Sequence, residues 1–341
     1  MTKKKVTFDD IARYTNFSKT TISRYFNAPE SLTEENQQII ARALDELNYH
    51  ENKIARVLAK GRSEFIGIIV PTLFYHYYAE ILNQILQSYE KYGYKFLVFV
   101  GTGDKEQERR YIQELLAYKI EGMIVMSHAI PSKELADTGV PIVAVEREDR
   151  YINSVNTDNY MGGVQAASLL AKNDCDIMLH VNTYVAKNVP AYGRIRGFVD
   201  VCKERNLRYA LIMRKFRNAY ADTNQIMQEV FESIRETYPG QRKGIFLAND
   251  TFANIMLNII MREYHHLPDE YRLVGFDNSP IAEQAVVPIS TVGQQIETLA
   301  VEAMELLLSQ MQARKEKTAK TRPRLIHKKI TPVLLRRETT S

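Results

Sequence analysis

Short apolar runs that alternate with helical segments dominate the sequence from Phe65 onward. Each run is rich in β-branched residues, and a longer stretch with the apolar period of a helix follows it. The runs are FIGIIV, YKFLVFV, GMIVMS and PIVAVE before residue 158, and DIMLHV, YALIMR, GIFLAND and YRLVGFD after it. Strands that alternate with helices form mostly parallel sheets that helices cover on both faces. We therefore expect an α/β body of two similar lobes, each with a doubly wound parallel sheet.

The first sixty residues have a different pattern, with three short amphipathic segments that predict an all-α head. Thr7 and Asp10 have the spacing of a capping box at the start of a first helix. Ser18 can cap a second helix up to Phe26, and Thr33 can cap a third. Two short helices joined by a turn of three residues are typical of a helix-turn-helix, but the same spacing also fits a small bundle used for assembly.

The net charge of +4 is mild, and its distribution says more than its size. Residues 1–62 contain 11 Lys and Arg against 8 Asp and Glu, whereas the other residues contain 34 against 33. The excess of positive charge therefore lies in the head, as expected of a nucleic-acid-binding domain, although a small solvated domain could carry it by chance.

Composition and motifs argue against several other classes of protein. The longest apolar runs are far shorter than the roughly 18 residues needed to cross a bilayer, and the basic start meets two aspartates before any apolar region. Cys175 and Cys202 form no CxxC pair, so no disulfide scaffold or cysteine zinc site is expected. These features predict a cytoplasmic protein without a membrane partner.

The sequence also lacks the signatures of common enzymes. GTGD at Gly101–Asp104 lacks the third glycine of a dinucleotide-binding fingerprint, and neither GxxxxGK[ST] nor GxSxG occurs. His265 and His266 are adjacent rather than at metal-ligand spacing. We therefore predict no catalytic residues, no cofactor and no metal, as suits a binding protein.

Two stretches, VTFDDIARYTNFSKTTISRYFN and ELNYHENKIARVLAKGRSEFIGIIVP, resemble the opening of the lactose/galactose repressor family, the LacI/GalR type. The resemblance extends through nearly the whole chain. It implies a ligand-controlled transcription regulator, expected to be a repressor, with a two-lobed sensor like the periplasmic binding proteins. The implied domains are a DNA-binding head at 1–50, a hinge helix and linker at 51–63, and the sensor at 64–341.

The resemblance also implies how the sensor is divided. Lobe one is expected at about 64–160 and 294–322, and lobe two at about 161–293 and 323–341. The final helix would then return to lobe one and the strand-like LIHKKITPVLL to lobe two, which gives three crossings between the lobes.

The resemblance places the helix Ser18–Phe26 in the major groove of double-stranded operator DNA. Lys19, Thr20 and Arg24 match the base-reading positions of the family. Lysine and arginine suit the O6 and N7 acceptors of guanine, and threonine can contact a thymine methyl group. The positions that usually hold the phosphate backbone are matched by Thr7, Ser18, Thr21, Ser23 and Asn27.

Two departures from the family pattern lie in the turn and the hinge. Asn16-Phe17 stands where Gly-Val is common, and Tyr49-His50-Glu51-Asn52 stands where the family has YxPN. Asparagine tolerates the left-handed conformation, so we expect the turn to survive. The loss of the proline affects the rigidity of the hinge.

The hinge segment Lys53–Lys60 is too short to be a stable helix alone, so it is expected to order against another surface. In the family, paired hinge helices lie in the minor groove, where an apolar wedge unstacks a central base step. Asn52, Ala55 and Leu58 match the DNA-contacting hinge positions, with Leu58 as the wedge. The alternative is an ordinary linker in which Leu58 packs against the sensor.

Ligands of open α/β sheets bind beyond the carboxyl ends of the strands. Asp158, Asn249 and Asp277 follow apolar runs, and Arg194 lies at a helix start. Each matches a ligand-contacting position of the family, and together they could hydrogen-bond the hydroxyl groups of a sugar. Asp158 and Asn249 also fit as ordinary helix caps.

Aromatic residues supply the rest of the expected ligand site. Of the cluster after the first strand, His76 and Tyr77 are expected to face the ligand and Tyr78 the core, with a helix starting near Ala79. Phe216 is a further candidate ring.

The sequence thus predicts a homodimer, or a higher oligomer, whose operator affinity a small polar metabolite controls from the cleft between the lobes. The alternatives are a sugar-binding protein or enzyme whose head serves assembly, and a nucleoid-type protein that binds DNA without an operator.

Overall fold

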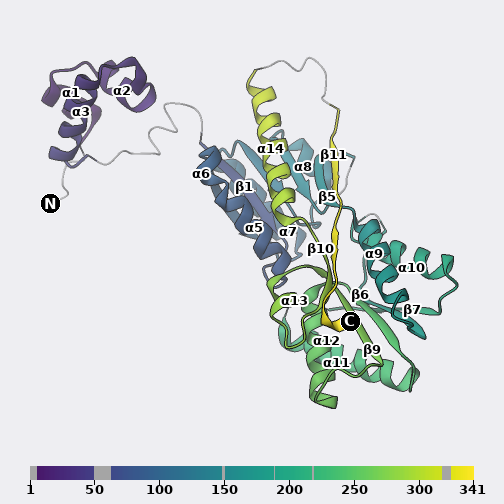
Figure 1. The fold of residues 1–341 in the computed structure, drawn as a ribbon. Helices are drawn as coiled ribbons and strands as arrows, with labels where there is room; N and C mark the ends of the chain where they lie inside the picture. The colour runs from purple at the N-terminus through teal and green to yellow at the C-terminus, as the bar shows by residue number, and fades with distance from the viewer. Residues whose placement is uncertain (1–5, 50–62, 148–149, 188, 217–218, 317–323) are drawn as a thin grey trace. The chain divides into compact units, whose positions relative to one another are not determined.

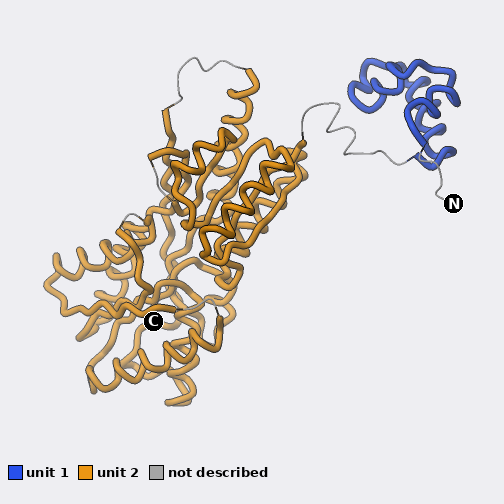
Figure 2. Tube along the Cα trace, turned by 180° about the vertical axis from the view of Figure 1, so that it is seen from behind, with its two compact units in different colours: residues 1–62 blue, residues 63–341 orange. Residues whose placement is uncertain are grey.

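The structure of the protein, a computed structural model, describes residues 6–49, 63–147, 150–187, 189–216, 219–316 and 324–341. The chain forms two compact units, residues 1–62 and residues 63–341 (Figure 2). The predicted hinge contacts Asn52, Ala55 and Leu58 lie outside the described residues. Across the described ranges, no helix is both long enough and apolar enough to pass through a bilayer. Within the same ranges, no cluster of His, Cys, Asp or Glu side chains is placed to hold a metal ion.

Within its described residues, 6–49, the first unit contains three helices, each of which starts at an expected cap. They are α1 (Phe8–Thr15), α2 (Lys19–Asn27) and α3 (Glu34–Glu46), with a 3-10 turn, η1 (Pro29–Ser31), before the third. The carboxylate of Asp10 accepts a hydrogen bond of 2.9 Å from the backbone N–H of Thr7. The hydroxyl of Ser18 accepts one of 3.1 Å from the N–H of Thr21. The local capping signals therefore set the helix starts.

A small apolar core joins the three helices, with Ile11, Ile22 and Ile40 fully buried at its centre. Asn16 has a φ of 57°, so the chain makes the left-handed turn between α1 and α2 without a glycine. The helix-turn-helix geometry is preserved despite the departure at this position.

The first lobe of the second unit contains a six-stranded parallel sheet in the order β11-β5-β4-β3-β1-β2. The strands are β1 (Phe65–Val70), β2 (Lys95–Val100), β3 (Gly122–Val125), β4 (Ile142–Val145), β5 (Asn153–Thr157) and β11 (His327–Ile330). Helices α5 (His76–Gln87) and α14 (Ile296–Lys315) pack on one face, and α7 (Lys105–Ala117) and α8 (Ser132–Asp137) on the other. The short α6 (Tyr89–Tyr92) follows α5.

The second lobe repeats this plan, with the strand order β12-β10-β9-β8-β6-β7. The strands are β6 (Ile177–Thr183), β7 (Tyr209–Arg214), β8 (Lys243–Leu247), β9 (Tyr271–Asp277), β10 (Ser290–Gly293) and β12 (Val333–Leu335), the last of them antiparallel. One face carries α9 (Asn159–Ala171) and α10 (Tyr192–Glu204), and the other α11 (Tyr220–Thr237) and α12 (Asp250–Tyr264). Short α13 (Pro280–Gln284) and η2 (Glu338–Thr340) complete the lobe.

The C-terminal segment differs from the prediction, which assigned all of residues 323–341 to lobe two. The chain instead pairs β11 with β5 of the first sheet and then β12 with β10 of the second (Figure 1). Pro332 interrupts the apolar run between the two strands, because proline has no N–H to donate to a strand ladder. The prediction was wrong for β11, and the lobes share this segment.

Candidate functional sites

The second helix of the head presents polar side chains on its outer face. Lys19, Thr20 and Arg24 are exposed, whereas Ile22 is buried against the core. Lys19 forms an ion pair of 2.5 Å with Asp9, and both side chains are largely solvent-exposed. Such a surface pair is weak, so Lys19 remains available to another partner. The predicted base-reading side chains therefore share one accessible surface.

The predicted phosphate contacts lie around the same helix. Thr7 is exposed at the start of α1, and its hydroxyl donates a hydrogen bond of 2.7 Å to Asp10. The remaining candidates are Ser18, whose hydroxyl lies 2.9 Å from that of Thr21, and Ser23, which accepts a hydrogen bond of 3.1 Å from Asn27.

A cavity of about 230 Å³ lies in the second unit, where residues that follow strands of both sheets come together. The first lobe contributes Tyr75, Tyr77, Tyr78, His128 and Glu146, and the second contributes Asn182, Thr183, Arg194, Asn249, Phe252 and Asp277, with Gln294 from the segment between the lobes. Four predicted ligand contacts, at positions 77, 194, 249 and 277, are therefore brought together. We call this cavity the cleft.

Arg194 is held in the wall of the cleft by three contacts. Its Nε donates a hydrogen bond of 2.7 Å to Oδ1 of Asn159, and its Nη1 donates one of 2.7 Å to the carbonyl oxygen of Ala248. The guanidinium carbon lies 3.6 Å from the ring centroid of Phe276, a cation–π contact. The orientation of the Arg194 cation is thus fixed by the protein itself.

Glu146 lines the cleft as well, and it was missed by the sequence analysis. Its carboxylate accepts hydrogen bonds of 2.5 Å from the N–H of Thr157 and 2.9 Å from Nδ2 of Asn159. Glu146 has a φ of 54°, in the left-handed region that residues other than Gly, Asn and Asp rarely adopt. It directly follows the strand PIVAV, so the rule that identified Asn249 and Asp277 could have found it.

Asp277 is buried at the end of β9 and accepts a hydrogen bond of 2.7 Å from Nε2 of Gln294. Burial raises the pKa of the Asp277 carboxyl to about 7, against the opposing effect of the Arg194 cation. The fully buried Asp250 accepts hydrogen bonds from the N–H of Ser279 at 2.7 Å and the hydroxyl of Thr291 at 2.6 Å. Burial, followed by the neighbouring Asp277, holds the pKa of Asp250 well above its ordinary range.

We expect the contribution of Asp277 to the free energy of unfolding to fall as the pH rises from about 4 to about 7, and Asp277→Asn to lose this pH-dependent part of the stability. The pKa of Asp277 rises from 3.8 in the unfolded chain to about 7 in the folded one. Its stabilising contribution is therefore complete below the lower value and lost as the pH passes the higher one. Denaturant unfolding at several pH values measures this difference. Asp269→Asn, at a side chain that is 94% exposed, is the control, and equal profiles for all three chains would refute the assignment.

The aromatic wall departs from the sequence prediction. Helix α5 begins at His76 rather than near Ala79, and successive helical side chains point about 100° apart. His76 is consequently exposed and does not line the cleft, whereas Tyr77 is buried and lines it. Tyr78 packs against the core, as expected, and also lines the cleft. Within the described part of the chain, the buried hydroxyl of Tyr77 has no hydrogen-bond partner.

Two other predicted contacts lie outside the cleft. Phe216 packs behind it, with its ring centroid 4.2 Å from that of Phe252. Asp158 caps α9 by accepting a hydrogen bond of 3.0 Å from the N–H of Met161, and it lines a different cavity. Asn249 combines the two roles, because it caps α12 through the N–H of Phe252 at 2.8 Å and also lines the cleft.

Comparison with known proteins assigns both parts of this architecture. Residues 7–52 match the model of the bacterial regulatory proteins of the lacI family, and residues 167–331 match that of the periplasmic binding protein-like domain. The chain joins a LacI-family head to a periplasmic binding protein-like body. The head is the DNA-binding helix-turn-helix of the protein. The prediction of a DNA-binding transcription regulator rather than an enzyme is confirmed.

Two curated LacI-family relatives match along most of their length. The ribose operon repressor of Halalkalibacterium halodurans is 28% identical over 311 residues, which cover 90% of each chain. The sucrose operon repressor of Streptococcus mutans is 26% identical over 307 residues, 89% of this chain and 92% of the relative.

Solved structures of transcription regulators share the fold. The lac repressor dimer bound to operator and the anti-inducer ONPF has a TM-score of 0.82 at 20% identity, over 99% of both chains. The complex of the transcriptional regulator CelR with cellobiose has a TM-score of 0.69 at 20% identity, over 98% of this chain and 100% of that one.

Proposed function

We propose that this LacI-family regulator is a cytoplasmic repressor that binds a near-palindromic operator as a homodimer. The outer face of α2 supports this assignment, because Lys19, Thr20 and Arg24 lie where one helix in a major groove can reach base edges. Thr7, Ser18, Thr21, Ser23 and Asn27 would fix the register on the phosphate backbone. In the hinge, Asn52, Ala55 and Leu58 would contact the minor groove.

The composition of the cleft favours an uncharged ligand rich in hydroxyl groups as the effector. The carboxyls of Glu146 and Asp277 face the single guanidinium of Arg194, so the cleft has no surplus of positive charge for a phosphate group. Carboxylate, amide and guanidinium groups can hydrogen-bond neighbouring hydroxyls, and tyrosine rings can pack on the apolar face of a sugar. The names of the ribose and sucrose operon repressors agree with a sugar.

The convergence of Arg194, Glu146 and Asp277 from two lobes is the observation that carries this proposal. A ligand that bridges the lobes favours one arrangement of them over others. Three chain segments connect the two sheets, so the lobes can rotate relative to each other. In a dimer, such a rotation would alter the spacing between the two hinge segments at residues 51–63. The effector would thereby change operator affinity, typically by about 5- to 150-fold.

A binding experiment with the full chain tests both parts of the proposal. Operator sequences selected from random oligonucleotides are titrated with the protein at several salt concentrations, with and without D-ribose, sucrose, cellobiose and other neutral sugars. We expect a selected motif with twofold symmetry, an affinity that falls steeply with salt, and a change in affinity with one sugar. Selection that returns no motif would refute the regulator, and a motif without any sugar response would refute the effector class.

A further inference from the structure

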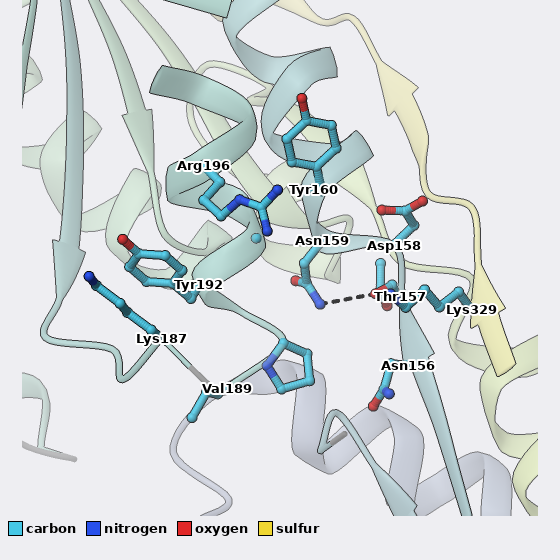
Figure 3. Close-up of a pocket in the computed structure, with 12 residues that line it drawn as sticks. Asn156, Thr157, Asp158, Asn159, Tyr160, Lys187, Val189, Tyr192, Arg196 and Lys329 are labelled. Atoms are coloured by element: carbon cyan, nitrogen blue, oxygen red, sulfur yellow. Dashed lines mark hydrogen bonds between the residues drawn. The ribbon is translucent and has the colours of Figure 1, made fainter. Parts of the chain in front are cut away.

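A second cavity, of about 320 Å³, lies beside the segments that connect the two lobes (Figure 3). Asn156, Thr157 and Lys329 line it from strands β5 and β11 of the first lobe, and residues of α9, of α10 and of the loop after β6 line it from the second. Of the residues lining the cleft, Val189 alone also lines this cavity. We call it the hinge-side cavity, after the segments that connect the lobes and not after the hinge of residues 51–63. The function proposed above does not use it.

The charges around the hinge-side cavity are mostly positive. Its lining includes the cations of Lys187, Arg196 and Lys329, and Asp158 is the one carboxylate among its lining residues (Figure 3). An oxygen of Asp158 is already engaged by the N–H of Met161 at the start of α9. In the described ranges, Lys187 and Arg196 form no ion pair, although both are exposed to solvent. The cavity therefore has the opposite charge balance to the cleft, whose acidic groups outnumber its one guanidinium.

A buried amide in the same cavity lacks a partner. Asn156 is 1% exposed, and its Nδ2 donates a hydrogen bond of 3.2 Å to the hydroxyl of Ser154. Its Oδ1 has no hydrogen-bond partner among the described residues. Rotating the amide by 180° would leave Nδ2 unpaired instead, so one polar atom of Asn156 stays unsatisfied in either orientation. A buried polar group of this kind needs a hydrogen-bond partner, which a ligand or a water molecule can provide.

We propose that the hinge-side cavity binds a small phosphate monoester that also carries hydroxyl groups. The guanidinium of Arg196 holds the phosphate, since guanidinium groups bind phosphate oxygens through paired hydrogen bonds, and Lys187 and Lys329 add positive charge to the lining. A hydroxyl of the ligand meets the amide of Asn156. The regulator then has two small-molecule sites of opposite preference, one for a neutral ligand in the cleft and one for an anion beside the segments that connect the lobes.

Hydrogen bonds connect the two sites directly. Asn159 lines the hinge-side cavity, and its side chain bonds both Glu146 and Arg194 of the cleft. Thr157 lines the same cavity and bonds Glu146 through its N–H and Gln294 through its hydroxyl. An anion between the lobes therefore shifts the arrangement that the cleft ligand also selects, and each ligand changes the affinity of the other. This coupling rests on the proposed function, whereas anion binding itself does not.

The chain contains no tryptophan, so Tyr192→Trp introduces a single fluorescent reporter into the wall of the hinge-side cavity. Titration of the full chain with glycerol 3-phosphate at constant ionic strength is expected to give a saturable change, with a weaker response to inorganic phosphate and none to glycerol. Tyr118→Trp, at an exposed residue that lines neither cavity, should report no change. Calorimetry on the unmodified chain checks that the reporter itself has not altered binding.

Arg196 variants locate the anion. We expect Arg196→Gln to raise the dissociation constant for glycerol 3-phosphate by about tenfold or more, because the charge-assisted pair is lost, and Arg196→Lys to raise it less, because lysine keeps the charge but not the paired hydrogen bonds. Arg205→Gln, at an exposed arginine at the end of the same helix that lines neither cavity, should leave anion binding unchanged. Equal affinity in Arg196→Gln and the unmodified chain, or no heat and no fluorescence change at all, would overturn the proposal. Operator binding in that case would leave the proposed function standing.

Discussion

Arg194→Ala is expected to abolish the sugar response of operator binding while leaving the ligand-free affinity for DNA unchanged. The substitution removes the cation of the cleft and leaves Asn159 Oδ1 and the carbonyl of Ala248 without their donor. Hydrogen bonds to charged groups contribute about 1.5–3 kcal/mol each. The loss of the cation and of the order it imposes should therefore weaken effector affinity by about 100-fold or more.

Operator titrations across a range of sugar concentrations measure this effect. Arg205→Ala is the matched control, because Arg205 is an exposed arginine at the end of the same helix and lines neither cavity. Thermal unfolding of both variants separates loss of the ligand from loss of the fold. A normal sugar response in Arg194→Ala would show that the effector binds elsewhere.

Arg24→Ala is expected to erase the preference for the operator over random DNA at one base pair of each half-site. A bidentate arginine–guanine pair contributes about 1–3 kcal/mol of discrimination, which corresponds to roughly 5- to 150-fold in relative affinity. Residual binding to random DNA should change much less, because contacts to phosphate remain.

Competition between the operator and single-base variants of it measures the discrimination. Arg13→Ala is the control, because Arg13 lies on α1, away from the outer face of α2, and forms an ion pair with Asp10. We expect Arg13→Ala to keep the ranking of the variants. An unchanged ranking in Arg24→Ala would mean that another side chain reads these bases.

Local signals predicted the head and most strands of the body. The caps at Thr7, Ser18 and Thr33 depend only on residues three positions away, so the sequence contains all the information that sets them. The apolar runs likewise predicted the alternation of strands and helices. The pairing of β11 was not predictable in this way, because the choice of a partner strand depends on contacts far away in the sequence.

The cleft was only partly predictable for a related reason. The position after a strand identified Asn249 and Asp277, and it would also have identified Glu146. The orientation of His76, Tyr77 and Tyr78 depended on where α5 starts, and a shift of three residues moved one ring out of the cleft and another into it. Boundaries of helices are less certain than their existence, and side chains in a first turn are the most affected.

The shared C-terminal segment has a consequence for how the protein is made. Strands β5 and β10 each have an open edge until residues 327–335 pair with them, and these residues leave the ribosome after all the other strands of the chain. Neither lobe of the nascent polypeptide can therefore complete its sheet until this short segment has been synthesised. Until then, the unpaired strand edges can pair with other chains. The two sheets are therefore completed together, at the end of synthesis.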